Sequence, residues 1–541
     1  MYPSLFNDVF GPIMIGPSSS ACAGPTRVGQ IARGVCGGTP VYYRICYVPN
    51  SGRAAFRVGM ATNLGLIAGV LGWDTEDSRL YRSLETAESL GMKVEVAVEP
   101  IPGNTNPNAM LLTMRNQQGE TSTLLGDSVG GGTIAILAID EFPVSDIKGE
   151  EYVLLLEHTG APEFQRAVLA ELESRFPSVS AGMLKVRSFS RPDRPGEELL
   201  AVFLENGQFD YQSLAALPGV SKVRMIEPIM PIITRKNAKP PLFTSVQELV
   251  ALAETEHTDC SEIAIRYEMG RTLETRQQLI DRMNRVWKII QGTVAKGKSG
   301  TVHHMRGPGH PLFAVQMEKR LAERQYITDE FVAKVLATAT YAHEGKNDKE
   351  TLSVAGPAAG CPPIMAGTLI PLAEKHGLSD KEIVHALFTA AAIGAVTYMK
   401  TIPTGEITGC TGEVGVGSAM AAGAAVTLVG GAPRYVDEAA SIALMNMFGL
   451  PCDPIAGGGC AMPCRGRSHT APLNALASAE LAMSGFEAVV PYDQVVEAMD
   501  DLYKKLPGFM KGSLEAGIPA TPAAQIEKER FAKWIETDLK S

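Results

Sequence analysis

The sequence lacks the features that define several common classes of protein. Lysine and arginine number 49 against 59 aspartates and glutamates, a formal charge of −10, so there is no basic excess of the kind that a general nucleic-acid binder needs. No basic leader precedes an apolar run in residues 1–17, and no low-complexity segment is present. Apolar residues are 45% of the chain and charged residues 20%. We therefore expect a folded protein with a core of ordinary size and no nucleic-acid partner.

Long, strongly apolar runs are also scarce. The two most apolar stretches, 384–399 and 414–431, are rich in alanine and glycine, whereas a membrane span usually has about 20 strongly apolar residues. We expect both to be buried helices of a protein with no membrane contact. The 9 cysteines occur without a secretory signal, which favours a reducing, cytoplasmic environment with thiols or metal ligands in place of disulfides.

Three units are expected along the chain. Residues 1–150 predict an α+β domain, with a helix at 85–90, strands at 93–98, 109–115 and 134–139, and a break at Gly130–Gly132. Residues 151–235 predict the order βαββαβ of a ferredoxin-like fold, with elements at 152–157, 162–175, 184–189, 198–204, 211–217 and 222–227. The length of this unit and the turn 158–160 resemble an ACT domain, a module that often binds amino acids.

The remainder is expected to be helical. Residues 236–245 contain Lys236, Lys239 and two prolines and predict a linker. From Ser245 onward the pattern predicts an all-α domain over 245–541. Its clearest predicted helices are 245–254, 261–291, 328–343 and 379–399, several with serine or threonine at the start.

Cysteines concentrate in this last unit. Five of the 9 lie between 361 and 464, and the last four of these each stand beside glycine or proline, where irregular backbone exposes sulfur for a metal. Two metal sites are compatible with the spacing. Cys452, Cys460, Cys464 and His469 have ligand spacing tolerable for zinc. Alternatively, thiolates of Cys410, Cys452 and Cys464 hold an iron–sulfur cluster, although the C-x₂-C-x₂-C run of ferredoxins is absent.

The segments around three cysteines favour the cluster. Residues 409–415 read GCTGEVG, 449–454 read GLPCDP and 462–467 read MPCRGR. This series resembles the α domain of iron–sulfur-dependent L-serine dehydratases, which has GCxGEVG, GLxCDP and VPCxxR in the same order. The resemblance implies that Cys410, Cys452 and Cys464 hold a [4Fe–4S] cluster whose fourth iron has no protein ligand. The additional Cys460 is an alternative third ligand.

The N-terminal unit carries further resemblance to the same family. GPSSS at 16–20 and GPTR at 24–27 are similar to the family's GPSSSHTxGPxR, and SVGGG at 128–132 is similar to its SIGGG. The order of β domain, ACT domain and α domain is also a family arrangement. The resemblance implies substrate contacts at Ser18, Ser19, Ser20, Arg27, Ser128 and Gly130.

The residues themselves support an anion site here. Three serines precede a helix expected near 26–34, where hydroxyl and free N–H groups favour anions. Residues 1–73 contain one acid, Asp8, against five arginines. In the helical unit, Arg467 has the two-pronged donor geometry that suits a substrate carboxylate.

Three family histidines are missing. Ala21 stands where the family has histidine in SSSHT, 59–63 (GMATN) stands for GHGTD, and 106–109 (NPNA) stands for HPNG. No histidine precedes His158. Three losses together indicate a remodelled pocket or a changed activity, so L-serine is not the expected substrate.

One other motif suggests a different chemistry. Residues 292–299 (GTVAKGKS) fit the Walker A string, but a phosphate-binding loop must follow a strand and open a helix. We reject a nucleotide site and expect a loop entering the active site, with Lys298 and Ser299 catalytic because the family has a Lys-Ser-Gly segment. His303 and His304 are candidates for the base that replaces the missing imidazoles.

These observations predict a cytoplasmic [4Fe–4S] lyase, expected as a homodimer. It would dehydrate or deaminate a small β-hydroxy or β-substituted amino or hydroxy acid, and an amino-acid effector could bind the ACT-like unit. Two alternatives stay open: an amino-acid or cluster sensor on the same scaffold, and a zinc-stabilised binding protein.

Overall fold

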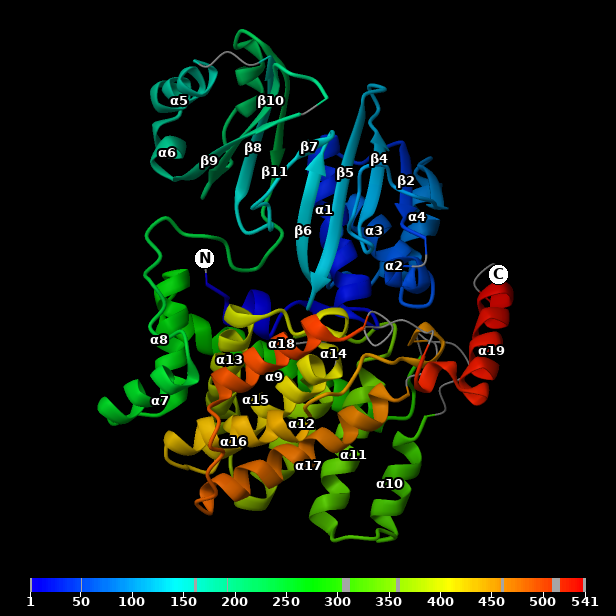
Figure 1. Ribbon diagram of the computed structural model, residues 1–541, viewed down its shortest axis with the longest axis vertical. Helices are drawn as coiled ribbons and strands as arrows, with labels where there is room; N and C mark the ends of the chain where they lie inside the picture. The colour runs from blue at the N-terminus through cyan, green and yellow to red at the C-terminus, as the bar shows by residue number, and fades with distance from the viewer. Residues whose placement is uncertain are drawn as a thin grey trace.

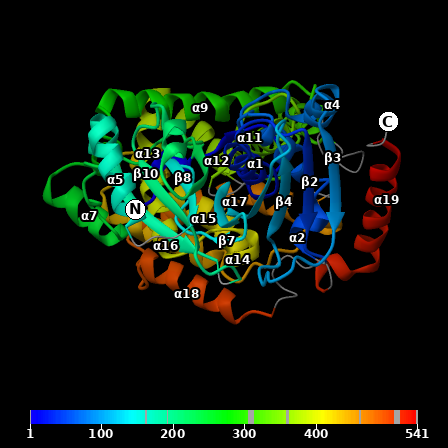
Figure 2. The ribbon, with the colours of Figure 1, turned by 90° about the horizontal axis from the view of Figure 1, so that it is seen from above.

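Two β-sheets stand above a bundle of helices (Figure 1). The computed structural model describes residues 2–49, 51–159, 163–191, 193–303, 312–356, 361–458, 462–507 and 516–538. His304 and Cys460 lie outside these ranges. Seen from above, the strands lie over the helices, and the last helix, α19 (Pro522–Asp538), stands at one edge of the molecule (Figure 2).

The N-terminal sheet has six strands in the order β3-β2-β4-β5-β6-β7. Their bounds are β2 (Tyr42–Tyr47), β3 (Lys93–Val98), β4 (Met110–Arg115), β5 (Thr121–Gly130), β6 (Thr133–Ile139) and β7 (Phe142–Pro143). In β4, Met110, Leu112 and Met114 alternate with less buried residues and enter the core beside α1 (Gly24–Cys36). Around this sheet lie α2 (Gly52–Phe56), α3 (Thr62–Val70), η3 (Leu80–Arg82) and α4 (Ser83–Ser89).

The predicted ferredoxin-like unit is confirmed by its topology. Four antiparallel strands have the order β11-β8-β10-β9, as a βαββαβ chain of this fold requires. The elements are β8 (Tyr152–Thr159), α5 (Phe164–Arg175), α6 (Pro177–Ala181), β9 (Met183–Ser190), β10 (Glu197–Leu204), η4 (Tyr211–Ala216) and β11 (Val220–Ile226).

The central strands β8 and β10 of this second sheet are buried on both faces, which explains their continuous apolar runs. Leu154 and Leu156 pack against α5, whereas Val153 and Leu155 join the core of the N-terminal sheet. The two sheets therefore share apolar packing.

The C-terminal region is largely helical, as expected. It contains α7 (Val246–Thr255), α8 (Cys260–Thr272), α9 (Arg276–Lys298), α10 (Ala314–Ala322), α11 (Glu330–Gly345), α12 (Cys361–His376), α13 (Asp380–Lys400), α14 (Gly405–Cys410), η5 (Thr411–Gly415), α15 (Val416–Leu428), α16 (Arg434–Asn446), η6 (Ile455–Gly458), α17 (Cys464–Met483), α18 (Tyr492–Lys505) and η8 (Ile518–Ala520). Among the described residues α13 alone is long and apolar enough to cross a membrane, and 78% of its most apolar window is buried in the structure. The small residues of α15 pack against α13 and α16.

Three sequence expectations need correction. The helix expected over 261–291 is interrupted at Leu273, whose φ of 60° ends α8, and Thr275 then caps α9. The segment 292–298, expected as a loop, is the end of α9. It stays helical because Gly297 lets α9 approach α11 closely: a Cβ there would lie 1.9 Å from the carbonyl oxygen of Tyr341.

The third correction concerns the all-α description. A two-residue strand, β12 (Ser353–Val354), pairs with β1 (Ile13–Met14) from the N-terminal unit. The N-terminal segment also enters the helical core, where η1 (Leu5–Val9) buries Leu5 and Val9. The helical region is thus completed by the first residues of the chain.

Candidate functional site

The three predicted cysteine ligands come from three breaks in the helical region. Cys410 ends α14 at a kink, where Gly409 adopts φ 62° and ψ −165°. Cys452 lies in the loop between α16 and η6, and Cys464 is the first residue of α17. Glycine is required at 409, since a Cβ there would lie 2.4 Å from the Tyr503 ring.

Shared neighbours bring these cysteines together. Burial raises the pKa of the Cys410 thiol well above its usual value, the nearby Cys464 raises it further, and a hydrogen bond from Arg467 lowers it. Tyr503 interacts electrostatically with both Cys410 and Cys452. Cys410 is therefore a neighbour of Cys464, and Tyr503 is a common neighbour of Cys410 and Cys452.

Hydrogen bonds hold the loop that carries Cys452. Arg467 donates to Asp453 at 2.6 and 3.2 Å and to the carbonyl oxygen of Pro451 at 3.0 Å. The Tyr503 hydroxyl donates to the carbonyl oxygen of Leu450, and the Leu450 amide donates to Thr411 at 3.0 Å. Arg467 thus ties α17 to the loop and at the same time faces the Cys410 sulfur.

The described residues do not form a site for a single metal ion. No three histidine, cysteine or acidic side chains among them converge closely enough. Cluster-binding cysteines bind different iron atoms and so stand farther apart than the ligands of one ion. The donor set of three thiols at breaks in the backbone fits a cluster in its chemistry.

His469, from the alternative zinc set, has unfavourable surroundings for a cation. Its ring lies 5.1 Å from the ring of His343 in an edge-on arrangement. Burial, together with the charges of Arg465 and Lys346, lowers the pKa of His469 to about 3. The imidazole is therefore neutral, but the same two cations oppose a zinc ion beside it.

The predicted serines lie at the foot of the N-terminal sheet. Ser18 caps η2 (Ser19–Ala23) by accepting a hydrogen bond from the Ala21 amide at 3.1 Å, and its hydroxyl lies 3.4 Å from that of Ser20. Ser128 packs so closely on α1 that a Cβ at Gly24 would lie 1.9 Å from its hydroxyl oxygen. The segment 18–24, which contains η2 and the first residue of α1, is therefore in contact with the segment 128–132.

Arg53 is a site residue that the sequence reasoning did not single out. It is 2% exposed and donates to the carbonyl oxygens of Ser20, at 2.7 Å, and of Ser128. It also lies 3.6 Å from Asp127, which accepts a hydrogen bond from Asn106 at 2.9 Å. Asn106 stands where the family motif has histidine, so an amide occupies the position of a lost imidazole.

The predicted Arg27 has a different role from Arg53. It is 2% exposed and donates to the carbonyl oxygen of Gly132 at 2.6 Å. Burial lowers its pKa to about 10, against the charges of Asp8 and Glu150. The guanidinium therefore fixes the glycine turn at 130–132 through the carbonyl oxygen of Gly132.

The glycine turn between β5 and β6 connects the two halves of the candidate site. A Cβ at Gly130 would lie 1.6 Å from Cγ2 of Thr404, and one at Gly131 would lie 2.3 Å from the Tyr398 hydroxyl. The residue after Thr404 is Gly405, where a Cβ would lie 2.7 Å from the Cys452 sulfur. The turn that carries Ser128 and Gly130 thus lies within a few residues of the cysteine region.

The predicted catalytic pair Lys298 and Ser299 lies on the surface. The Lys298 amine is 3.3 Å from a carboxylate oxygen of Glu318 in α10, and Ser299 donates to the carbonyl oxygen of Lys296 at 2.6 Å. His303 is exposed, and its amide donates to the buried Asp348 at 2.7 Å. In the described part of the chain, these three residues contact α9, α10, α11 and the segment after α11. His304 lies outside it.

Comparison with known proteins identifies relatives of this chain. A family model described as "Serine dehydratase alpha chain" matches residues 255–518. The Bacillus subtilis protein described as "Probable L-serine dehydratase, alpha chain" is 30% identical over 291 residues, which are 54% of this chain and 96% of that protein. The beta chain described in the same organism is 32% identical over 229 residues, 42% of this chain and 98% of that protein.

A single-chain relative shows a similar match. L-serine dehydratase 1 of Escherichia coli is 26% identical over 283 residues, 51% of this chain and 61% of that protein. Regions similar to an alpha chain and to a beta chain are thus joined in one polypeptide. The chain belongs to the L-serine dehydratase family of lyases.

Proposed function

We propose that the protein is a [4Fe–4S]-dependent dehydratase or deaminase of a small β-hydroxy or β-substituted amino or hydroxy acid other than L-serine. The observation that carries this proposal is the grouping of Cys410, Cys452 and Cys464 around Arg467, next to the Gly130 turn. Family membership supports the reaction class. The missing imidazoles support a different substrate.

The cysteine region fits such a cofactor. Cys410 is 3% exposed, and a buried thiolate needs positive charge beside it. When bound, a cluster with one iron free of protein ligands supplies a Lewis acid that makes a β-hydroxyl a better leaving group. Arg467 keeps the Cys452 loop in place through Asp453.

The sheet side supplies the groups for an acid substrate. Ser18, Ser19 and Ser20 surround the start of η2, and Ser128 and Gly130 close the opposite wall. Arg53 orders both segments through their carbonyl oxygens. We assign substrate binding to these serines, to Gly130 and to Arg27 and Arg467, with hydroxyl and N–H groups donating to the substrate carboxylate.

The overall chemistry requires one base. Loss of water from a 2-amino-3-hydroxy acid gives an enamine, which tautomerises to an imine and hydrolyses to a 2-oxo acid and ammonia. A base must remove the α-proton, and the neutral Asn106 cannot do so. We keep Lys298, Ser299, His303 and His304 as candidates for acid–base catalysis, which requires the 299–303 segment to move toward the cysteines when substrate binds.

A spectroscopic comparison of cysteine variants tests the cofactor. Anaerobically purified protein is expected to be brown, with about four irons per chain. Cys410→Ser, Cys452→Ser and Cys464→Ser should each lose most of the iron and the visible absorbance. Cys36→Ser, a buried thiol at the end of α1, is the matched control and should keep both.

Two results would contradict the cofactor assignment. Colourless wild-type protein with stoichiometric zinc would favour the zinc-stabilised alternative. Iron lost in Cys460→Ser but retained in Cys464→Ser would move the third ligand to Cys460.

Release of a 2-oxo acid separates an enzyme from a sensor. A panel of hydroxy- and thio-amino acids should include at least one compound turned over faster than L-serine. An iron-loaded protein that turns over none of them would favour the alternative of a sensor that kept the scaffold and lost the histidines.

The remaining assignments complete the proposal. We propose units at 1–150, 151–235 and 245–541, the middle one ACT-like and open to an amino-acid effector. We also propose a cytoplasmic homodimer that binds neither nucleic acid nor membrane. The net charge of −10 and the absence of a basic excess support the last point.

A further inference from the structure

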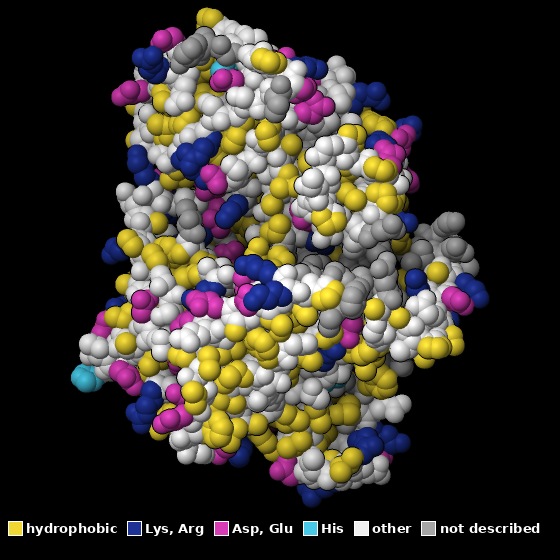
Figure 3. All heavy atoms as spheres, in the orientation of Figure 1, with side chains coloured by type: hydrophobic (Ala, Val, Ile, Leu, Met, Phe, Trp, Pro, Cys, Tyr) yellow, Lys and Arg dark blue, Asp and Glu magenta, His cyan; other side chains and the backbone are white. Residues whose placement is uncertain are grey.

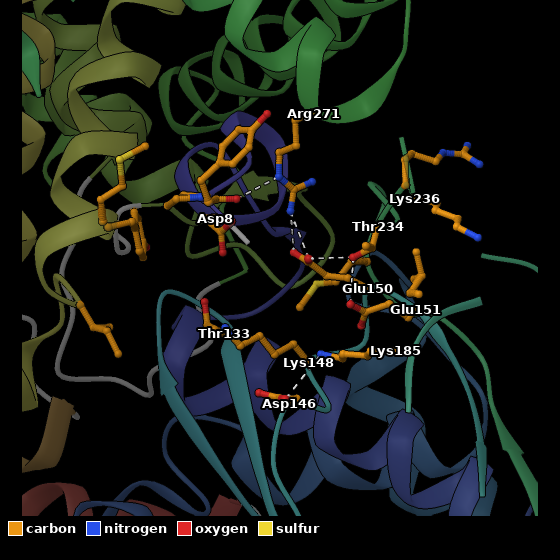
Figure 4. A pocket seen from close by; sticks show the side chains of 18 residues that line it. Asp8, Thr133, Asp146, Lys148, Glu150, Glu151, Lys185, Thr234, Lys236 and Arg271 are labelled. Carbon is orange, nitrogen blue, oxygen red and sulfur yellow. Dashed lines mark hydrogen bonds and ion pairs between the residues drawn. The ribbon is translucent and has the colours of Figure 1, made fainter. Parts of the chain in front are cut away.

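A cavity of about 750 Å³ lies where the two sheet units meet the helical region (Figure 4). Figure 3 shows the same face hollowed between the upper and lower parts of the molecule, with acidic and basic side chains inside. Its walls come from the N-terminal segment, the β6 start, the segment before β8, the β9 start, the segment 230–236 after β11, the end of α8 and the end of α13. Every unit of the chain therefore contributes to the cavity.

The charges that line the cavity are of both signs and nearly balanced. Four acids (Asp8, Asp146, Glu150, Glu151) face five bases (Lys148, Lys185, Arg235, Lys236, Arg271). Part of this charge is paired within the protein. Glu150 accepts two hydrogen bonds of 3.1 Å from Arg271, and Asp146 lies 3.7 Å from Lys185 (Figure 4). A polyanion or a polycation would meet like charge on some wall.

Glu151 leaves one oxygen for a ligand. Its side chain lines the cavity, and the residue is only 7% exposed. Oε1 accepts a hydrogen bond from Thr234 at 2.9 Å, whereas Oε2 is buried without a hydrogen-bond partner in the described structure. A buried carboxylate oxygen without a donor is costly, so a rotation of this side chain toward the cavity would let an incoming ammonium group supply the missing donor.

Asp8 and the exposed lysines complete a dipolar arrangement. Asp8 is a second acid on the inner wall, and burial together with the charge of Glu150 raises its pKa to about 6. Lys148 and Lys236 are exposed, and the Lys236 amine donates to the carbonyl oxygen of Ala181 at 2.7 Å. The buried Arg271 is paired with Glu150, whereas Lys148 and Lys236 lie nearer solvent than Asp8 and Glu151.

We propose that this cavity binds a free α-amino acid as an effector, with its ammonium group on Glu151 and its carboxylate toward Lys148 and Lys236. Such a zwitterion matches both signs of charge at once. The apolar side chains of Leu184, Met230 and Met399 on the walls would receive its side chain.

The site differs from the effector position implied by the ACT-like resemblance. That position begins at His158 and Thr159, the last two residues of β8, whereas Glu151 immediately precedes the first residue of β8. The two positions lie at opposite ends of a strand of eight residues. Binding at Glu151 therefore needs neither that turn nor a second copy of the chain.

The cavity wall leads to the proposed catalytic region. Tyr398 lines the cavity and its hydroxyl abuts Gly131, and Thr133 on the opposite wall begins β6 just after the same turn. Thr404, a few residues after Tyr398, packs on Gly130. An amino acid held here would stabilise one position of the glycine turn and so change turnover. Binding itself does not depend on the proposed reaction; only this coupling does.

Equilibrium dialysis with each of the 20 L-amino acids, on the iron-loaded full chain, tests the binding. At least one is expected to bind in addition to any substrate. Its Kd should rise at least tenfold in Glu151→Gln and severalfold in Lys148→Ala. Glu163→Gln and Lys319→Ala, which change exposed ion-paired residues on α5 and α10, are the matched controls and should bind as wild type.

The surface variant keeps the test valid if Glu151→Gln unfolds, because Lys148 is exposed. Binding of no amino acid, or equal binding by wild type and Lys148→Ala with an intact circular dichroism spectrum, would overturn the proposal. If the wild type bound inorganic phosphate or ATP tightly and the same variants lost this binding, the cavity would be assigned to an anion instead. Retained binding in the iron-free Cys410→Ser protein would separate this site from the catalytic one, so that failure of one assignment leaves the other measurable.

Discussion

Single buried residues join segments that are far apart in this chain. Glu268 on α8 is fully buried and accepts hydrogen bonds from the Ser4 hydroxyl at 2.6 Å and the Leu5 amide at 3.1 Å. It therefore fixes the N-terminal segment in the helical core. Arg53 has a similar role in the sheet unit, where it donates to the carbonyl oxygens of Ser20 and Ser128.

The charge of Glu268 makes stability depend on pH. Burial raises its pKa from 4.5 to about 7. A carboxyl whose pKa is higher in the folded state holds its proton more tightly there, so the folded protein loses stability as the pH rises from about 4.5 to about 7. The loss is on the order of 3 kcal/mol for this shift. Glu268→Gln should flatten the fall in melting temperature between pH 5 and pH 7.5.

An exposed acid provides the control for this measurement. Glu256→Gln, on the surface beside Arg266, should keep the wild-type pH dependence. Equal slopes for wild type and Glu268→Gln would show that Glu268 does not ionise in this range.

The sequence predicted which residue types form the site better than it predicted the tertiary contacts that those residues make. The cysteines stood out because each lies at a glycine or proline break within a motif. Arg53 did not, because an isolated arginine carries no local signal and its partners come from residues 20, 127 and 128. The location of Lys298 on the surface likewise depends on the packing of α9 against α11, which begins 32 residues later at Glu330.

At the scale of elements, the close packing of α9 against α11 determined where α9 ends, which the local sequence pattern did not predict. The resemblance of 298–300 to the family's Lys-Ser-Gly segment predicts a loop at the Walker-like string, yet α9 continues to Lys298. Its glycines differ in function: Gly297 touches the backbone of Tyr341, whereas nothing lies within 4 Å of a Cβ at Gly292. The same residue type is thus required at one position and dispensable at the other.

This difference gives a paired prediction. Gly297→Ala should push α9 from α11 and lower stability by about 1–3 kcal/mol, as overpacking does. Gly292→Ala, on the exposed side of the same helix, should raise stability by about 0.5–1 kcal/mol through helix propensity. Melting temperatures of the two variants test this. Similar destabilisation by both would mean that helix contact is not the cause.

Strands with regular alternation or continuous apolar runs were predicted close to their observed bounds, as in β3, β4 and β8. β5 was not, because Gly126 and Asp127 interrupt its pattern. The structure tolerates Asp127 there since Asn106 and Arg53 compensate its carboxylate. Burial of a charge in a strand is a tertiary effect that sequence alone does not reveal.

At the scale of the whole molecule, activity depends on how the sheet unit sits on the helices. The contact is the glycine turn at 130–132, which meets Thr404, Tyr398 and Pro12. Tyr398 belongs to the effector cavity and Thr404 adjoins the cysteine region. A shift of this turn would therefore change both the cavity wall at Tyr398 and the surroundings of the cysteines near Thr404.

The variant Gly131→Ala, alone and combined with Tyr398→Phe, tests this dependence. The new Cβ would lie 2.3 Å from the Tyr398 hydroxyl, and the φ of 60° adds about 1–2 kcal/mol of backbone strain. We expect 2-oxo acid release to fall at least tenfold. Gly131→Ala with Tyr398→Phe should recover most of it, since the removed hydroxyl is buried without a hydrogen-bond partner in the described structure.

Gly119→Ala, with φ 86° and nothing within 4 Å, carries similar strain without the contact. It should lower the melting temperature but not turnover, and equal loss of turnover in Gly119→Ala would show that strain, not the contact between units, limits the enzyme.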